Sequence, residues 1–230
     1  MEGEFGWGQK DDTFNVSDYF KNYKSQQFSI GDKDLALKLL RNQMLHDGQT
    51  LTEITKFLTE FYNLNCDLLP MTNDQIKTTL TTSDNEILSF QEYFVERKAE
   101  PELKEVAYKG AENASITDEV KKALMEADQI VIGPILSISI IKELISSNGN
   151  VTVVSPFIDN KALKGPSDEN FKAFGLEPNI EGLKIFYKDI ANNYIVHENE
   201  KSEKNVKTKN ILFSDKEIAI NLANEIISDE

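Results

Sequence analysis

Two short stretches near the start of the chain contain the side chains that could carry chemistry. Residues 6–14 and 31–37 are dense in glycine, tryptophan, lysine and aspartate before any long helical or strand period begins. Core packing does not explain such clusters, whereas loops on a rigid scaffold carry most binding residues. The candidate groups are Trp7, Lys10, Asp12, Thr13, Asp32 and Asp34.

Several of these candidates also have a structural interpretation. Trp7 is the only tryptophan of the chain and could anchor a core, and Thr13 could merely cap a turn. Asp32 and Asp34 stand at a predicted helix start, where the helix dipole favours carboxylates without any ligand. One of these two aspartates could therefore be only a cap.

The charge balance excludes two classes of partner. The 230 residues include 39 acidic and 25 basic side chains, which gives a net charge of −14. General nucleic-acid binders and proteins of anionic membranes need a basic face, so neither kind of partner is expected. A phosphorylated small molecule is still compatible, because a local lysine and backbone N–H groups can hold phosphate in an acidic protein.

No stretch resembles a targeting or membrane-spanning segment. Residues 1–4 lack the apolar core of a signal peptide, and the most apolar run, 130–141, is too short to span a bilayer. The single cysteine, Cys66, excludes a disulfide framework and is expected to be a small buried side chain. We therefore expect a cytoplasmic protein.

Local patterns before residue 117 predict helices followed by a β-hairpin. Apolar residues recur at helical spacing over 33–47, and Thr50 to Glu53 form a capping box that opens a second helix. The two helices should form an αα-hairpin. Residues 77–82 and 87–95 are rich in strand formers around a polar turn, which predicts a β-hairpin.

From residue 117 helices and strands alternate. Strands are expected at 128–132, 151–154 and 210–213, helices at 117–127, 139–147, 168–174, 181–190 and from the capping box 214–217, and a solvated loop at 198–209. Such alternation implies βαβ units and a parallel sheet. We predict an α/β fold, with a Rossmann-like parallel sheet flanked by helices and an inserted, mainly helical subdomain carrying a β-hairpin. The expected parts are a ligand-facing loop region at 1–30, the insert at 31–116 and the C-terminal half at 117–230.

Several segments together resemble one enzyme family. Residues 6–14, 31–37, 41–51, 90–101 and 155–166 are similar, in order, to the 2-phospho-L-lactate transferases of coenzyme F420 biosynthesis. The resemblance implies a Rossmann-like enzyme assisted by Mg²⁺. Its substrates are a guanylylated three-carbon acid and the deazaflavin Fo, and its products are GMP and the F420 core. Such a reaction is a displacement at phosphorus, in which positioning and charge neutralisation carry most of the catalysis.

The resemblance assigns expected roles to single residues. Lys10 matches the lysine of the family's Trp-Gly-x-Lys-x-Asp-Thr motif and is expected to contact Fo, while the flat face of Trp7 suits stacking on the deazaflavin ring. Gly133 and Pro134 match a Gly-Pro of the family at the end of a strand. The other expected site residues are Thr13 as a ligand contact and Asp12, Asp32 and Asp34 as catalytic groups.

The chain also departs from the family pattern. The Gly-Gly-Thr-Gly loop with which the family begins is not found, and Ile135 and Leu136 follow Gly133-Pro134 directly, where the family has a further Ser-Asn loop. Asp159 and Asn160 replace two glycines of the family. We therefore expect a truncated copy with an internal deletion. The alternatives are a non-catalytic Fo-binding remnant, a truncated gene model and a sugar-nucleotide-binding relative. Related enzymes suggest a homodimer.

Overall fold

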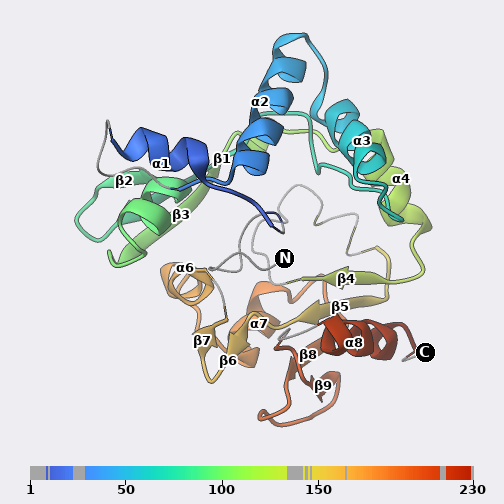
Figure 1. Ribbon diagram of the computed structural model, residues 1–230. Coiled ribbons are helices and arrows are strands. Elements are labelled where there is room, and N and C mark those ends of the chain that lie inside the picture. Colours follow the sequence, from blue (N-terminus) through green and yellow to red (C-terminus); the bar gives the residue numbers. More distant parts are fainter. Residues whose placement is uncertain are drawn as a thin grey trace. The chain divides into compact units, whose positions relative to one another are not determined.

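The computed structural model describes residues 9, 11–22, 29–133, 142, 145, 147–163, 165–212 and 216–228. By its internal contacts the chain divides into two compact units, Met1–Asn73 and Asp74–Glu230. The first unit is helical, and the second contains a parallel and an antiparallel sheet (Figure 1). The three-part division expected from the sequence stays a prediction. No helix in the described part of the chain is long and apolar enough to cross a membrane.

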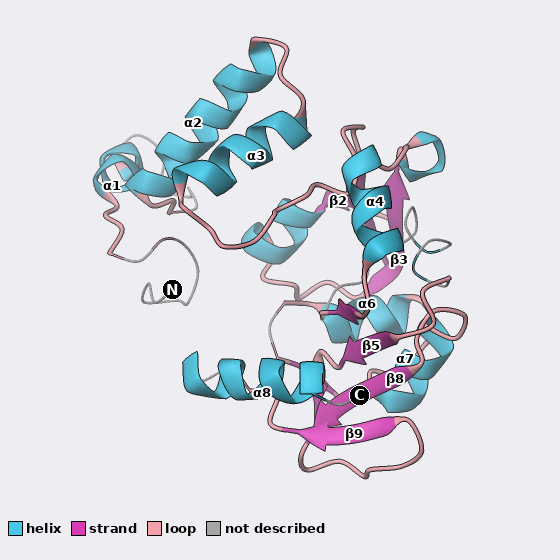
Figure 2. Ribbon diagram, turned by 90° about the vertical axis from the view of Figure 1, so that its right-hand side faces the viewer, coloured by secondary structure: helices cyan, strands magenta, loops and turns pink. Residues whose placement is uncertain are grey.

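The described residues of the first unit form three helices. They are α1 (Asn15–Lys21), α2 (Asp32–His46) and α3 (Leu51–Phe61). Helices α2 and α3 form the predicted αα-hairpin (Figure 2). Thr50 caps α3 as the sequence predicts, because its side chain accepts a hydrogen bond from the Glu53 N–H and the Glu53 carboxylate accepts one from the Thr50 N–H at 2.7 Å.

Few side chains of this unit are buried. Ile54 is its only fully buried hydrophobic residue in the described ranges, and none of the residues of α2 is fully buried. Leu39 and Phe61 are exposed by 60% and 66% of their surface. Cys66 is exposed as well, so the expectation of a buried cysteine is wrong.

The second unit begins with an antiparallel sheet of three strands in the order β2-β1-β3. The strands are β1 (Lys77–Thr82), β2 (Ile87–Ser89) and β3 (Leu103–Lys109). Strands β1 and β2 form the predicted hairpin, whereas no local signal predicted β3. The sheet buries a small core made of Leu80, Leu88, Tyr93, Leu103 and Val106.

The second strand of this hairpin is shorter than the sequence suggests. Residues 90–95 were expected to continue it, but Glu92–Glu96 form a π-helix. The physical reason is a reciprocal cap. The Ser89 N–H donates to the Glu92 carboxylate at 2.7 Å, and the Glu92 N–H donates to Ser89 Oγ at 3.2 Å. This Ser-x-x-Glu pairing starts a helical turn and ends the strand.

A 3₁₀ turn at Ala111–Asn113 leads into helix α4 (Asp118–Glu126). The sequence places the start of this helix correctly, because Thr117 Oγ1 accepts the N–H of Val120 at 3.3 Å. After α4 the chain enters the parallel sheet.

The parallel sheet confirms the predicted α/β class. Its strands are β4 (Ile130–Ile132), β5 (Val151–Val154), β8 (Asn193–His197) and β9 (Val206–Lys209), in the order β4-β5-β8-β9. Every neighbouring pair in it is parallel. The buried strands read as continuous apolar runs because both faces of the sheet are covered.

Alternate residues of β5 and β8 face different helices. Val151, Val153 and Val196 pack in one core with helices α6 (Ser167–Ala173) and α7 (Ile180–Phe186). Val154 and Ile195 pack in another core with α8 (Lys216–Ser228). Figure 2 shows the parallel sheet between α7 and α8. The carboxyl ends of its strands therefore lie between two layers of helices.

Two expectations for the last third of the chain are wrong. The segment 198–209 is not only a loop, because Val206–Lys209 form β9 and pair with β8. Residues 210–212 are not a strand, because the Asn210 side chain accepts the Leu212 N–H at 3.0 Å and turns the chain. Most of the helix expected at 139–147, and residues 214 and 215 of the last capping box, lie outside the described residues.

Candidate functional site

The structure brings four of the expected site residues together in the first unit. Asp12, Thr13, Asp32 and Asp34 meet where the loop before α1 touches the first turn of α2. Of the remaining candidates, Gly133 lies in the second unit, at the end of β4. Trp7, Lys10 and Pro134 lie outside the described residues.

Asp12 caps helix α2 from outside the helix. Residue Gly31 occupies the N-cap position, where it has no side chain to accept the first N–H groups. Asp12 supplies the missing acceptor, since Oδ1 accepts the N–H of Lys33 at 2.9 Å and Oδ2 accepts the N–H of Asp34 at 3.3 Å. A Cβ at residue 31 would overlap the Asp12 carboxylate. Gly31, which has no Cβ, therefore leaves room for the Asp12 carboxylate.

The pKa of Asp12 is shifted by this environment. Partial desolvation raises the pKa, but the backbone N–H groups of Lys33, Thr13 and Asp34 and the charge of Lys33 lower it more. The net effect is a pKa below the ordinary value, so Asp12 is ionised at neutral pH. An ionised carboxylate at a helix N-terminus is favoured by the helix dipole.

Asp32 caps a different helix from the one that it begins. Its Oδ1 accepts the Val16 N–H at 3.0 Å and its Oδ2 accepts the Asn15 N–H at 3.1 Å, both in the first turn of α1. The Thr13 hydroxyl donates to Oδ2 at 2.6 Å. This hydroxyl is the main cause that lowers the pKa of Asp32 to about 2, with the Val16 N–H second, against an opposing effect of desolvation. Asp32 therefore joins α1 to α2.

Asp34 has a different neighbour, which the sequence did not reveal. The Gln9 side chain donates from Nε2 to Asp34 Oδ1 at 3.2 Å, and the Tyr62 hydroxyl donates to Gln9 Oε1 at 3.2 Å. Within the described residues, the bond from Gln9 is the only hydrogen bond to the Asp34 carboxylate. Since Tyr62 lies 53 residues from Gln9, no local pattern could have predicted the contact.

The residues of this cluster do not fit a magnesium site. Oxygens of Asp12 and Asp32 accept N–H and O–H donors at positive helix ends, where a further cation is disfavoured. Mg²⁺ needs near-octahedral oxygen ligation. In the part of the chain that the structure describes, no group of three or more His, Cys, Asp or Glu side chains could hold a metal ion.

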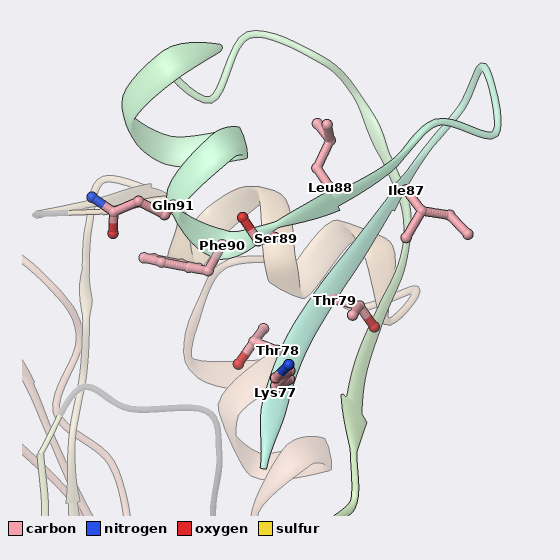
Figure 3. A pocket seen from close by; sticks show the side chains of 8 residues that line it. All are labelled: Lys77, Thr78, Thr79, Ile87, Leu88, Ser89, Phe90 and Gln91. Carbon is pink, nitrogen blue, oxygen red and sulfur yellow. The ribbon is translucent and has the colours of Figure 1, made fainter. Parts of the chain in front are cut away.

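A hollow of about 380 Å³ lies at the β1–β2 hairpin of the second unit. The residues that line it include Ile87, Leu88 and Phe90, which are apolar, and Lys77 and Thr78, which are polar. Figure 3 shows Phe90 and Thr78 on one side of the strand pair. Apolar walls with a few polar groups are typical of small-molecule sites. The sequence predicts the hairpin itself and the family-like segment that starts at Phe90, but not a hollow beside them.

The carboxyl edge of the parallel sheet is the second polar region of this unit. In open α/β sheets ligands bind outside the carboxyl ends of the strands. Ser155 follows β5, where its hydroxyl accepts the Phe157 N–H at 3.0 Å, and His197 ends β8 in a buried position. Beyond β8 and β9 a hollow of about 350 Å³ lies against α8, next to the Lys209–Glu225 ion pair of 3.0 Å.

No contact with the described residues requires a glycine at Gly133, which lies at the same edge. Its φ is not in the left-handed region, and a Cβ placed there would meet no atom within 4 Å. Neither backbone strain nor packing within the described residues explains a glycine at this position. Close approach of a ligand is a further reason for glycine at such an edge.

The Asp159-Asn160 pair forms the turn of a small hairpin. Strands β6 (Phe157–Ile158) and β7 (Lys161–Ala162) flank it, and both turn residues are left-handed, with φ of 51° and 62°. A two-residue turn with two positive φ values is the type I′ hairpin turn, which favours glycine, asparagine and aspartate. The geometry of this turn suits the two glycines of the family as well as Asp159 and Asn160 in this chain. Close approach of the backbone to a ligand is therefore not needed to explain glycines at these positions.

Comparisons with known proteins agree with the motif set. A family model described as "2-phospho-L-lactate transferase CofD" matches residues 10–227. Among curated proteins named 2-phospho-L-lactate transferase, that of Methanosarcina mazei is 29% identical over 206 residues, which are 86% of this chain and 68% of the relative. The Methanocaldococcus jannaschii protein is 31% identical and covers 84% and 66%. That of Methanococcoides burtonii is 29% identical and covers 96% and 78%. The chain thus spans about two thirds of the length of the first two relatives.

Solved structures support the fold alone. A Bacillus halodurans protein aligns with a TM-score of 0.58 at 14% identity, over 87% of this chain and 73% of that chain. A second structure, described as a member of the UPF0052 family from the same organism, aligns with a TM-score of 0.52 at 16% identity, over 84% and 63%.

Proposed function

The chain belongs to the CofD family of 2-phospho-L-lactate transferases, and from this premise we propose that it is a transferase of coenzyme F420 biosynthesis. Its donor is lactyl or enolpyruvyl diphosphoguanosine, and its acceptor is the deazaflavin Fo. The terminal ribityl oxygen of Fo attacks the phosphorus of the donor that carries the three-carbon acid. The bond from that phosphorus to the GMP oxygen breaks, and the hydroxyl proton of Fo passes to a base. GMP and the F420 core are the products.

One observation carries the proposal most directly. Two of the stretches that resemble the family meet in their described residues, because Asp12 of the first accepts the N–H groups of Lys33 and Asp34 of the second. Residues that meet one ligand must be held in a fixed relative position, since positioning supplies much of the rate of a phosphoryl transfer.

The proposed roles follow from how each carboxylate is engaged. Asp12 and Asp32 cap helix N-termini, so we propose that they maintain the structure of the site. Thr13 connects them, because it donates a hydrogen bond to each carboxylate. The Asp34 carboxylate accepts a single hydrogen bond, from Gln9, among the described residues. It is therefore the proposed acceptor of the hydroxyl proton. A positioned carboxylate contributes by general base catalysis.

Other expected contacts stay part of the proposal. Lys10 is proposed to contact Fo, Trp7 to stack on its ring, and Gly133 with Pro134 to face the ligand at the sheet edge. The lack of a structural requirement for glycine at residue 133 supports the last assignment. Mg²⁺ and a homodimer are expected from the family resemblance. The acidic cluster of the first unit does not fit Mg²⁺ and is not proposed to hold it.

The test is release of GMP from the donor by the purified chain in the presence of Fo. The Asp34→Asn variant should lose activity by about 10²- to 10⁴-fold, as the removal of a general base does. Asp47→Asn is the matched control, since Asp47 follows the other end of α2 and also accepts a glutamine side chain. Unchanged activity in Asp34→Asn would overturn the assignment of the base. No GMP release by the wild-type chain together with saturable Fo binding would favour the non-catalytic alternative.

A further inference from the structure

Two lysines lie directly opposite each other in the antiparallel sheet of the second unit. Lys77 of β1 is paired with Lys109 of β3, and both residues are exposed. Directly opposed side chains lie on the same face of a sheet, where two like charges destabilise the pairing. Among the described residues, neither lysine forms an ion pair. In a chain with 39 acidic and 25 basic side chains, an unbalanced pair of cations needs an explanation.

The strand register places hydroxyl groups on the same face as these lysines. Thr79 follows Lys77 by two residues on β1 and is paired with Ser89 of β2. Because side chains alternate along a strand, all three lie on one face, and Leu80 lies on the other face, in the core. Ser89 Oγ accepts the Glu92 N–H at 3.2 Å, so the Ser89 hydroxyl proton can still be donated to an acceptor. Ammonium and hydroxyl donors together favour an anion.

An aromatic ring borders the hollow of about 380 Å³ that Lys77 lines. Phe90 lines the same hollow, and its ring stacks on that of Phe94 with 5.7 Å between the ring centroids. The residue is nevertheless exposed by 40% of its surface. In the view of Figure 3, Phe90 and Ile87 lie at opposite ends of the hollow, and Lys77 lies between them. A ring that is held by a neighbour and still exposed offers a stacking surface to a planar ligand.

The first residues of the segment 90–101 divide into structural and unexplained ones. Glu92 caps the π-helix through Ser89, and Tyr93 is completely buried. Phe90 and Gln91 are exposed, and both line the hollow. Short π-helical turns occur frequently at functional sites. The exposed residues of this family-like segment therefore have no structural role that explains them, but they share one surface.

We propose that the hollow at the β1–β2 hairpin binds an anionic ligand with a planar aromatic ring, as a nucleotide has. The ring stacks on Phe90, and the phosphate lies against the ammonium groups of Lys77 and Lys109, whose mutual repulsion it relieves. The volume of the hollow is in the range of small-molecule sites. This site goes beyond the proposed function, because none of the residues assigned to that function lines the hollow. Only the choice of GMP as the probe rests on the proposed function.

Backbone amide shifts of the full, ¹⁵N-labelled chain locate the site. GMP should shift the amides of residues 77–79 and 87–91, which line the hollow, in a saturable way. Guanosine lacks the phosphate and inorganic phosphate lacks the ring, so each should bind there at least about tenfold more weakly. The proposal is overturned if GMP shifts only amides at the carboxyl edge of the parallel sheet, or if guanosine binds at the hairpin as tightly as GMP.

Variants separate a binding role of the lysine from a structural one. Lys77→Gln should weaken GMP binding at the hairpin about tenfold and yet raise the thermal midpoint by about 1–3 °C, because it removes the repulsion of Lys109. Phe90→Ala should weaken binding about tenfold through the loss of stacking. Lys104→Gln is the matched control, since Lys104 is an exposed lysine of β3 that donates to Asn85 Oδ1 at 2.8 Å. Wild-type affinity in Lys77→Gln, or an equal loss in Lys104→Gln, would refute the site.

Failure of the proposed function gives a different result from failure of this inference. If the chain releases no GMP from the donor but shows saturable hairpin shifts, the inferred site stands and the proposed function is lost. If the chain releases GMP and the hairpin amides do not respond to it, the function stands and the inferred site is refuted.

Discussion

Thr13 and Asp32 bind each other through two reciprocal hydrogen bonds. The Asp32 N–H donates to the Thr13 carbonyl oxygen at 2.6 Å, and the Thr13 hydroxyl donates to Asp32 Oδ2 at 2.6 Å. The pair joins the loop before α1 to the start of α2 across 19 residues. Thr13, which could have been a simple turn cap, thus connects stretches 6–14 and 31–37, which contain most of the candidate site residues.

The first prediction concerns the pKa of Asp32. Its folded-state value of about 2 lies below the ordinary value of 3.8. Folding therefore favours the ionised form, and the stabilisation is fully present above about pH 4 and is lost as the pH falls toward 2. Thr13→Val should raise the pKa of Asp32, because the Thr13 hydroxyl is the main cause of its low value. The pH-dependent stabilisation should then be smaller, and its loss should be complete at a higher pH than in the wild type.

Carboxyl ¹³C NMR titration of the wild type and of Thr13→Val measures this shift. Thr59→Val is a suitable control, because the Thr59 hydroxyl donates to a carbonyl within α3, at 2.9 Å, and not to a carboxylate. An Asp32 titration curve that is identical in the wild type and Thr13→Val would contradict the assignment.

The second prediction concerns Gly31. In Gly31→Ala the new methyl group would overlap the Asp12 carboxylate, which would have to leave the N-terminus of α2. The N–H groups of Lys33 and Asp34 would lose their acceptor, and their hydrogen exchange should become several-fold faster. Gly133→Ala is the matched control, because its methyl group would meet no atom within 4 Å. Equal protection of both amides in Gly31→Ala and the wild type would refute the contact.

The third prediction concerns the stability of the first unit. Ile54 is completely buried, and Ile54→Ala should destabilise this unit by about 2–5 kcal/mol, as large-to-small core changes do. Phe61→Ala on the same helix should cost less than about 1 kcal/mol, since 66% of its surface is exposed. Urea unfolding followed by circular dichroism compares the two. An equal loss of stability in Ile54→Ala and Phe61→Ala would mean that Ile54 is not the centre of the core of the first unit.

The fourth prediction concerns the β6–β7 turn. Because Asn160 has a φ of 62°, Asn160→Val should cost about 1–2 kcal/mol, the penalty of a branched side chain in the left-handed region. Asn160→Gly should be neutral or stabilising, since glycine suits this turn position. Chemical denaturation of both variants distinguishes a true type I′ turn from a flexible loop, in which valine would be tolerated.

The elements that the sequence predicts well are those with local signals. The caps at Thr50 and Thr117 and the apolar runs of β4 and β5 are each contained within a few residues, and the structure confirms them. Strand β9 was not predicted because Val206 is its only buried residue, and its polar residues, with Lys207 and Lys209, are typical of a solvated loop. The Ser-x-x-Glu pattern at Ser89 is also local, but the β-forming residues around it favour a strand.

The candidate site was predictable only in part. The sequence indicates that Asp12, Asp32 and Asp34 belong to one functional region, because the family motifs occur in order. It cannot show that Asp32 caps α1, or that Gln9 meets Tyr62, because these contacts join residues 16 to 53 positions apart. Side-chain pairings of this range depend on how the helices pack and not on local pattern.

The most direct test of the proposed function is Fo fluorescence during titration with the purified chain, with and without GDP and Mg²⁺. We predict saturable binding that is weaker in Lys10→Ala. Lys38→Ala is the matched control, since Lys38 is an exposed lysine of α2 outside the first turn of the helix, and it should bind Fo as the wild type does. No Fo binding by a chain that is folded by circular dichroism would contradict the proposal, and the family relationship would then describe ancestry only.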